Sequence, residues 1–272
     1  MNKDLIRLDK DLIRMDKDLV VIIMAGGLGT RMESNVPKVI HKLGGIPMIN
    51  HILRNLQKLE EKINLKQILI VVGKYRNQIQ EAIESDLVMT NINIKYINQP
   101  EPLGTGHAVQ CCLSELVQYP NSNTLILSGD VPMFSINSMF HLVYNLTKAR
   151  ITITTNENPA GYGRIIITNN KFERIVEHND CTPEQLNVVK INCGIYAFNT
   201  GILCKWLPYI NNNNKKGEYY LTDIVEIIRR EENTEIELYD LPPEKMIEVI
   251  GVNTISQLNE LEKLIRKTNK IE

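Results

Sequence analysis

The sequence predicts an α/β fold: a Rossmann-like, doubly wound and mostly parallel sheet that carries a smaller β-rich lobe. Three observations predict it. Short apolar runs alternate with segments of helical pattern, and glycine-rich or acidic loops follow the runs directly. A strand buried on both faces of a parallel sheet is apolar along its whole length, and strands alternating with helices are typical of βαβ units. Because ligands of such sheets bind at the carboxyl ends of the strands, we expect these loops to form the functional site.

The first half of the chain supplies the parallel part of the predicted sheet. Its three strands are the apolar runs LVVIIM (residues 19–24), QILIVVG (67–73) and NTLILSGD (123–130). Helical patterns lie between them, over residues 48–59, 77–83 and 106–117. This alternation predicts strands that are joined by helical crossovers.

The second half is richer in strand-like runs. Four of them, ITITT, RIIIT, FERIVEH and NVVKINCGIYAF, lie between residues 151 and 198. We interpret a region of about residues 151–222 as the smaller lobe, which forms one wall of a cleft. No composition break marks a linker, so residues 19–253 are expected to form one unit with two lobes. The later pattern predicts a helix over residues 220–230, strands near Ile236 and Glu248, and a C-terminal helix within residues 254–272.

Residues 1–18 contain a near-repeat of seven residues, KDLIRLD, KDLIRMD and KDL. Their apolar positions follow the 3-4 spacing of a coiled-coil seam, at Leu5, Leu8, Leu12, Met15 and Leu19. About two heptads are present, fewer than the three to four that identify a coiled coil. We therefore interpret this segment as an exposed helical extension, with a self-association helix as the alternative.

The composition argues against several classes of function. A formal net charge of −1 over 272 residues leaves no basic excess for binding nucleic acid. No apolar run reaches the roughly 18 residues of a membrane span, and the N-terminus lacks the apolar segment of a signal peptide. The five cysteines form no C-x-x-C pair, which fits a reduced compartment. We expect a cytoplasmic protein that binds neither nucleic acid nor membrane.

The first predicted strand leads directly into the glycine-rich loop AGGLGTRM, residues 25–32. Glycines let a backbone approach a phosphate closely, and consecutive N–H groups in such a loop bind anions. A dinucleotide fingerprint would require glycine at Met32, and a plain turn is the other alternative. Arg31 and Lys38 add two cations beside the loop, which favours a triphosphate clamp.

Two polar residues, Asp130 and Gln99, indicate further ligand contacts. Asp130 ends the third strand, where it is either a helix cap or a metal ligand, and the neighbouring glycine loop favours the metal. Mg²⁺ prefers one or two protein oxygens and completes its shell with water and phosphate oxygens. Gln99, beside LGTG, offers an amide donor and acceptor to a base edge. The five histidines show no metal-binding spacing, and Ser128 lies in no G-x-S-x-G motif.

AGGLGTRM followed by PKV resembles the signature of the sugar-nucleotide pyrophosphorylases. Further matching segments follow in order: QPEPLGTGHAV, LSGDVPMF, GYGRI, IVEHND, INCGIYAF, NNNNKKGEYYLTDIV and EVIGVN. Together they resemble the uridyltransferase half of the bacterial bifunctional N-acetylglucosamine-1-phosphate uridyltransferases/glucosamine-1-phosphate acetyltransferases. The resemblance implies a nucleotide-diphospho-sugar transferase fold. It also implies that UTP and N-acetylglucosamine-1-phosphate react to give UDP-N-acetylglucosamine and pyrophosphate.

The resemblance further implies roles for individual residues and a Mg²⁺ cofactor. The catalytic cations would be Arg31 and Lys38, and the metal ligands Asp130 and Asn253. The nucleotide would be held by Ala25, Gly26, Gly27, Gly29, Gln99, Gly104 and Thr105. The sugar would be held by Gly163, Glu177, Asn192, Tyr220 and Thr222.

The chain departs from the family pattern at three positions. Leu28 stands where the bacterial subfamily usually has lysine, Ser128 replaces an aromatic residue, and Cys193 replaces threonine. Two alternatives therefore stay open. One is the same chemistry with another pair, such as glucose-1-phosphate uridylyl or mannose-1-phosphate guanylyl transfer. The other is a non-catalytic sensing subunit, against which the presence of Arg31, Lys38, Asp130 and Asn253 argues. No hexapeptide repeats follow Asn253, so we expect no acetyltransferase half and a monomer or dimer instead of its β-helix trimer.

Overall fold

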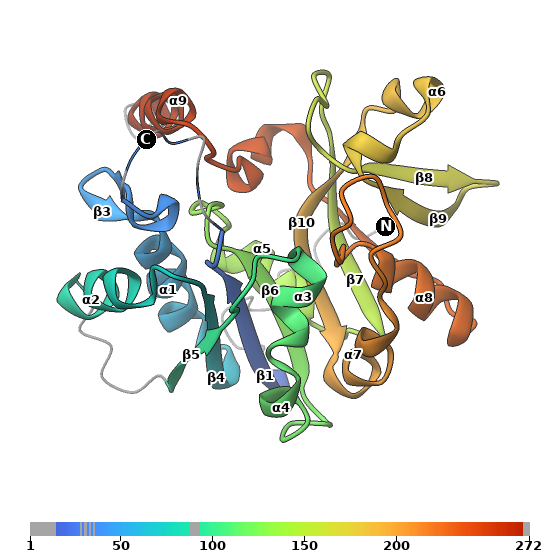
Figure 1. Cartoon of the computed structure of the whole chain (residues 1–272), viewed down its shortest axis with the longest axis horizontal. Helices are drawn as coiled ribbons and strands as arrows, with labels where there is room; N and C mark the ends of the chain where they lie inside the picture. Colours follow the sequence, from blue (N-terminus) through green and yellow to red (C-terminus); the bar gives the residue numbers. More distant parts are fainter. Residues whose placement is uncertain are drawn as a thin grey trace, which may run out of the picture.

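The computed structural model describes residues 15–27, 29, 32, 34, 36–86 and 93–268. Within these residues, a mixed nine-stranded sheet runs through the molecule with helices on both of its faces (Figure 1). The order along the sheet is β11-β7-β10-β6-β1-β4-β5, and a β8–β9 hairpin joins at β10. The predicted α/β fold with a mostly parallel central part is therefore confirmed.

The centre of the sheet is parallel. Its strands are β1 (Met15–Met24), β4 (Ile63–Val72), β5 (Ile94–Asn98) and β6 (Asn123–Ser128). β1 pairs in parallel with β4 on one side and β6 on the other, so that Ile22 lies opposite both Leu69 and Ile126. Three of these strands contain the predicted apolar runs, which are buried because helices cover both faces.

β1 begins at Met15 rather than at Leu19. Both residues, which the heptad pattern assigned to one helical seam, are buried in this strand, and Met15 pairs with Ile63 of β4. Residues 15–18 are therefore sheet and not part of a helical extension. The rest of the predicted extension, residues 1–14, lies outside the described residues.

The helices form two layers. One layer contains α1 (Met48–Leu59), α2 (Arg76–Asp86) and α5 (Ile136–Val143); the other contains α3 (Thr105–Gln110), α4 (Leu113–Leu116), α7 (Thr200–Trp206) and α8 (Asp223–Glu231). Alternate side chains of β1 serve the two layers, since Val21 and Ile23 pack with the first and Val20 and Ile22 with the second. The predicted helix over residues 106–117 is thus two short helices. None of the helices that the structure describes is long and apolar enough to span a bilayer.

The second half of the chain extends the same sheet. β7 (Ala149–Thr155), β10 (Lys190–Asn199) and β11 (Glu237–Asp240) are its added strands, and β10 runs antiparallel to β6 and β7. A smaller group projects at the far end from β5: β8 (Arg164–Thr168), β9 (Lys171–Val176) and α6 (Pro183–Leu186) (Figure 1). The region of residues 151–222 is therefore not a separate β layer, because most of β7 and all of β10 belong to the main sheet.

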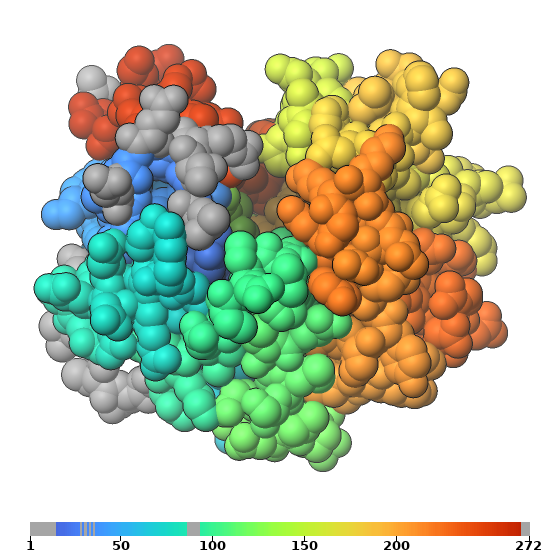
Figure 2. All heavy atoms as spheres, viewed as in Figure 1, coloured from blue at the N-terminus to red at the C-terminus, as the bar shows by residue number. Residues whose placement is uncertain are grey.

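After β11 the chain crosses back above the sheet. The strand expected near Glu248 is wrong: Pro242 precedes a 3₁₀ helix, η5 (Pro243–Val249), and Pro243 occupies its first turn. The C-terminal helix is present as α9 (Ile255–Thr268). Figure 2 shows the surface hollowed between α9 (red) and the yellow-green segment that precedes β8.

Candidate active site

Backbone hydrogen bonds join the loops that follow the central strands. The N–H of Ala25, after β1, donates to the Val71 carbonyl at 2.9 Å, and the N–H of Gly129, after β6, donates to the Met24 carbonyl at 3.0 Å. The N–H of Gln99, after β5, donates to the Val72 carbonyl at 2.7 Å. These bonds bring the glycine loop, the Asp130 turn and Gln99 to one edge of the sheet.

A first cavity of about 300 Å³ opens at this edge. Its lining includes Lys38 and six of the seven predicted nucleotide-binding residues: Ala25, Gly26, Gly27, Gln99, Gly104 and Thr105. The seventh, Gly29, does not line it. Gly29 has a φ of +60°, and a Cβ there would lie 2.9 Å from the Lys38 Cβ, so glycine lets the loop pack directly against the Lys38 stem.

Gln99 is held in the cavity wall by its side chain. Its Nε2 donates to the Gly104 carbonyl at 3.1 Å and lies 3.2 Å from His107 Nδ1. Its Oε1 faces Gly26, where an added Cβ would approach it to 2.9 Å. The amide of Gln99 therefore lies beside the glycine loop with its oxygen turned toward that loop.

Gly104 needs to be glycine for two reasons. Its φ is +115°, and a Cβ there would lie 2.5 Å from the Tyr219 carbonyl oxygen. The segment is closed against its neighbour by two hydrogen bonds, from Tyr219 N–H to the Leu103 carbonyl at 2.8 Å and from Gly106 N–H to the Tyr219 carbonyl at 2.7 Å. This pairing fixes the wall that carries Thr105.

Three polar side chains from distant parts of the chain meet at the bottom of the site. Lys38 Nζ donates to Asp130 Oδ2 at 2.5 Å and to Asn253 Oδ1 at 3.0 Å. The Val252 N–H donates to the Asp130 carbonyl at 2.9 Å, which holds Asn253 beside Asp130. Ser128 Oγ donates to Asp130 Oδ1 at 2.6 Å, so both oxygens of this carboxylate accept a hydrogen bond. The structure thus brings Lys38 together with Asp130 and Asn253, the two residues that the resemblance implies as metal ligands.

Two positions of the glycine loop that the sequence singles out lie outside the described part of the chain. They are Arg31, the second predicted cation, and Leu28, the departure from the family pattern. Their roles stay as predictions.

A second cavity of about 230 Å³ adjoins the first, and Met24, Thr105, Ser128 and Asp130 line both. Its lining includes four of the five predicted sugar-binding residues, Gly163, Glu177, Asn192 and Thr222, together with Asn253. The cluster of Lys38, Asp130 and Asn253 therefore stands at the boundary between the two cavities.

The polar groups of the second cavity are pre-oriented by one another. The Asn192 N–H donates to the Gly163 carbonyl at 2.9 Å, and Asn192 Nδ2 donates to the Tyr196 hydroxyl at 2.6 Å. Thr222 Oγ1 donates to Glu177 Oε1 at 3.1 Å. Burial raises the pKa of the Glu177 carboxyl, while the Thr222 hydrogen bond acts in the opposite direction.

Tyr220 lies outside this cavity, contrary to the prediction. The Asp223 N–H donates to the Tyr220 carbonyl at the start of α8, and this turn separates the side chains of Tyr220 and Thr222. The Tyr220 ring is buried in a neighbouring pocket that Glu177, Asp180 and Asp223 also line. Its position is therefore behind Glu177 rather than within the cavity.

Several residues that line the cavities were not predicted as site residues: Met24, Glu218, Tyr162, Tyr196, Cys193, Ser128 and Gly251. Two of them, Ser128 and Cys193, could have been found, because they depart from the family pattern. For Tyr162, Tyr196 and Met24 the sequence contains no such signal.

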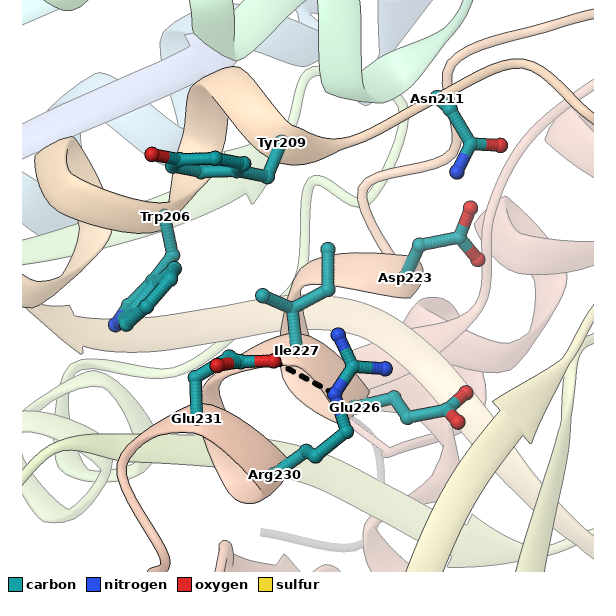
Figure 3. A pocket seen from close by; sticks show the side chains of 8 residues that line it. All are labelled: Trp206, Tyr209, Asn211, Asp223, Glu226, Ile227, Arg230 and Glu231. Atoms are coloured by element: carbon teal, nitrogen blue, oxygen red, sulfur yellow. Dashed lines mark hydrogen bonds and ion pairs between the residues drawn. The ribbon is translucent and has the colours of Figure 1, made fainter.

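A further cavity of about 420 Å³ lies on the outer side of α7 and α8 (Figure 3). It is lined by Trp206, Tyr209, Asn211, Asp223, Glu226, Ile227, Arg230 and Glu231, none of which was predicted as a site residue. Its Arg230 is ion-paired with Glu231 at 2.8 Å. Burial and the nearby charges of Glu177 and Glu226 raise the pKa of Asp223 to about 6. This cavity lies away from the loops that follow β1 and β6, and its lining contains none of the residues of those loops.

Comparisons with known proteins identify the family of the chain. A sequence model of the family described as Nucleotidyl transferase matches residues 20–241. The chain is 42% identical over 248 residues to a protein of Acanthamoeba polyphaga mimivirus named "Probable UDP-N-acetylglucosamine pyrophosphorylase", covering 89% of this chain and 94% of that protein.

Bacterial relatives and a solved structure extend the comparison. The chain is 37% identical over 249 residues to the "Bifunctional protein GlmU" of Saccharophagus degradans and 38% identical over 252 residues to that of Clostridium botulinum. It covers 52% of each of these proteins, and 91% and 90% of this chain is matched. A crystal structure of a Bacillus anthracis protein assigned as a glucose-1-phosphate thymidylyltransferase matches with a TM-score of 0.68 at 20% identity, over 91% of this chain and 95% of that one. The last match supports the fold, and the family match and the first relative show that the chain belongs to the nucleotidyl transferase family.

Proposed function

We propose that this chain joins UTP to N-acetylglucosamine-1-phosphate and releases pyrophosphate and UDP-N-acetylglucosamine. The observation that carries the proposal is the pair of adjoining cavities with Lys38, Asp130 and Asn253 at their boundary. A nucleotidyl transfer needs two binding sites whose phosphates meet, with positive charge at the meeting point. The name of the mimivirus relative supports the choice of substrates.

In this reaction a phosphate oxygen of the sugar phosphate attacks the α-phosphorus of UTP. A new P–O bond forms, the bond between the α-phosphorus and the bridging oxygen breaks, and pyrophosphate leaves with that electron pair. Because the second pKa of such a phosphate is about 6, the attacking oxygen is already ionised at neutral pH, and no general base is required. Catalysis then consists of alignment and charge neutralisation, to which Lys38 and Arg31 contribute.

The residues at the boundary fit a Mg²⁺ ion. Asp130 and Asn253 present a carboxylate and an amide oxygen to one point, where both contact the Lys38 ammonium, and Mg²⁺ prefers one or two such ligands. In the part of the chain that the structure describes, no group of three His, Cys, Asp or Glu side chains could hold a metal. When bound, the ion would neutralise charge on the phosphates of both substrates.

Each cavity carries the groups that its proposed substrate requires. In the first, Gln99 Oε1 is oriented beside Gly26 and can accept a hydrogen bond from the edge of a uracil ring. In the second, Glu177, Asn192 and Thr222 supply acceptors and donors for sugar hydroxyls and an acetamido group.

The test is pyrophosphate release, measured for the purified chain with every pairing of four nucleoside triphosphates and four sugar phosphates. We expect UTP with N-acetylglucosamine-1-phosphate to give the highest kcat/KM, and glucosamine-1-phosphate to react poorly because it lacks the acetamido group. A higher kcat/KM with glucose-1-phosphate or with GTP and mannose-1-phosphate would contradict the proposed substrates. No release with any pair, at saturating Mg²⁺, would instead indicate a non-catalytic subunit.

A further inference from the structure

The Lys38 ammonium lies at the point that the proposed function gives to a metal ion. It is 2.5 Å from Asp130 Oδ2 and 3.0 Å from Asn253 Oδ1. A Mg²⁺ ion bound to the same two oxygens would need distances of about 2.0–2.1 Å to each. Two cations cannot occupy that position together, because they would overlap and repel each other.

The surrounding contacts show which of the three side chains is free to move. Asp130 Oδ1 is fixed by the Ser128 hydroxyl at 2.6 Å, which turns Oδ2 toward Lys38. The backbone beside Asn253 is fixed from α9, because Gln257 Oε1 accepts from the Asn253 N–H at 2.7 Å and the Thr254 N–H at 3.1 Å. Lys38, in contrast, carries its charge on a flexible four-carbon stem.

The base of the Lys38 side chain is anchored, while its ammonium end can reach both Asp130 and the first cavity. Its Cβ packs against Gly29, and its carbonyl accepts from the His41 N–H at 3.2 Å within η2 (Lys38–Ile40). The same side chain lines the first cavity beside Gly26 and Gly27. A rotation of the stem, without backbone movement, can therefore carry the ammonium from Asp130 toward bound phosphates.

We propose that Lys38 and a divalent cation compete for Asp130 Oδ2 and Asn253 Oδ1, and that Lys38 moves to the triphosphate when the cation binds. This proposal rests on the proposed function, since it takes both the cation and the triphosphate from it. The phosphates receive the displaced ammonium, so each ligand favours the binding of the other. Metal and nucleotide then bind cooperatively, and either one alone binds weakly.

The test is a titration of the protein with Mn²⁺ in the absence of nucleotide. The electron paramagnetic resonance signal of free Mn²⁺ reports how much of the metal is bound. Because Lys38→Met removes the positive charge that occupies the metal position and repels a second cation there, we expect it to bind Mn²⁺ at least about tenfold more tightly than the wild type. Ser128→Ala should act in the opposite direction, about 10- to 100-fold more weakly, as for other residues that orient a metal ligand. Lys42→Met, which removes an exposed lysine of the same segment, is the control for net charge and should match the wild type.

Wild-type or weaker Mn²⁺ affinity in Lys38→Met would overturn the competition. A second measurement uses the wild type, so that a folding defect in the variant cannot decide the outcome. Reductive methylation followed by mass spectrometry should show that saturating Mg²⁺ increases modification of Lys38, whose side chain is only 16% exposed, and leaves Lys42 unchanged. Modification of Lys38 that does not change while Mn²⁺ binds would also contradict the proposal.

These readouts separate the inference from the proposed function. Pyrophosphate release by the wild type together with unchanged Mn²⁺ affinity in Lys38→Met would refute the competition and leave the function standing. Tighter Mn²⁺ binding in Lys38→Met without any pyrophosphate release by the wild type would refute the function and leave the competition standing.

Discussion

Asp130→Asn removes one negative charge from the boundary of the two cavities and leaves the shape of the side chain unchanged. The variant keeps an oxygen that can accept from Lys38 and a polar neighbour for Ser128. It loses the carboxylate that the proposed metal site depends on. Removing one pre-positioned electrostatic contact costs about 10²- to 10³-fold in kcat, so we expect a fall of at least about 100-fold, equivalent to roughly 2.7 kcal/mol of transition-state stabilisation.

Folding should be affected much less than turnover. The ion pair joins side chains that are 16% and 14% exposed, but its hydrogen bond persists in the variant. Since a charged hydrogen bond exceeds a neutral one by about 1 kcal/mol, the free energy of unfolding should fall by about that amount. Urea denaturation measures the change in the free energy of unfolding. Steady-state pyrophosphate release at saturating Mg²⁺ measures the change in kcat.

Asp240→Asn is the matched control. Asp240 forms an ion pair with Lys190 at 2.6 Å on the surface, and its side chain is 53% exposed, so the same chemical change there should leave kcat unaltered. Turnover of Asp130→Asn within a few-fold of the wild type would refute the assignment of Asp130 to the metal. An equal loss in both variants would mean that the assay reports a general effect of charge.

Three further predictions concern the loop, its wall and the second cavity. Arg31→Ala should lower kcat more than it raises the KM for UTP, because charge builds on the leaving pyrophosphate only in the transition state. An unchanged kcat in steady-state kinetics would restrict Arg31 to substrate binding. Gly104→Ala should lower the free energy of unfolding by about 3 kcal/mol or more, because the added Cβ would clash with the Tyr219 carbonyl. Gly44 also has a positive φ, +58°, but open space surrounds its Cβ position, so Gly44→Ala should cost only about 1–2 kcal/mol. Equal losses of the two variants in urea denaturation would show that the Tyr219 contact does not matter. Glu177→Gln should stabilise the fold at neutral pH, because burial raises the pKa of Glu177 in the folded state and ionisation then opposes folding. This gain should shrink as pH falls through the folded pKa and vanish below the unfolded value of about 4.3, so urea midpoints that differ equally at pH 7.5 and pH 3.5 would contradict it.

The centre of the sheet could be predicted because burial on both faces leaves a continuous apolar run, as in β1 and β6. β5 was missed for the converse reason. It is the last strand of the sheet, none of its residues is fully buried, and Lys95 and Asn98 are exposed, so no apolar run marks it. α5 was missed although its signal was present, since Ser135 caps it by accepting from the Ser138 N–H at 3.2 Å.

Gln99 could be singled out only by the adjacent LGTG, because the strand before it, β5, was not predicted. The glycine loop could be placed from sequence because it directly follows a predicted strand. The meeting of Lys38 with Asp130 and Asn253 could not, because these residues are 92 and 215 positions apart. That contact depends on the Val252 N–H bond to the Asp130 carbonyl, which no local pattern encodes. The resemblance implies Lys38 as a triphosphate cation and Asp130 and Asn253 as metal ligands, but it does not imply this contact. It also implies Tyr220 as a sugar-binding residue, which the turn at the start of α8 moves behind Glu177.

The two departures from the family pattern that the structure describes fall on different walls, and they should therefore have different effects. Ser128 bonds the Asp130 carboxylate and lines both cavities, so it acts on groups that any nucleotidyl transfer would use. Cys193 is 6% exposed and lines only the second of these cavities, next to Asn192, where the proposed acetamido sugar lies.

Ser128→Ala should accordingly reduce kcat/KM by the same factor with N-acetylglucosamine-1-phosphate and with glucose-1-phosphate. Cys193→Thr should instead change the ratio between the two sugars, because a hydroxyl at this buried position must find a hydrogen-bond partner on the sugar or on the protein. Both ratios come from pyrophosphate release at fixed, saturating UTP. A changed ratio in Ser128→Ala, or an unchanged one in Cys193→Thr, would show that selectivity and chemistry are not divided between these walls.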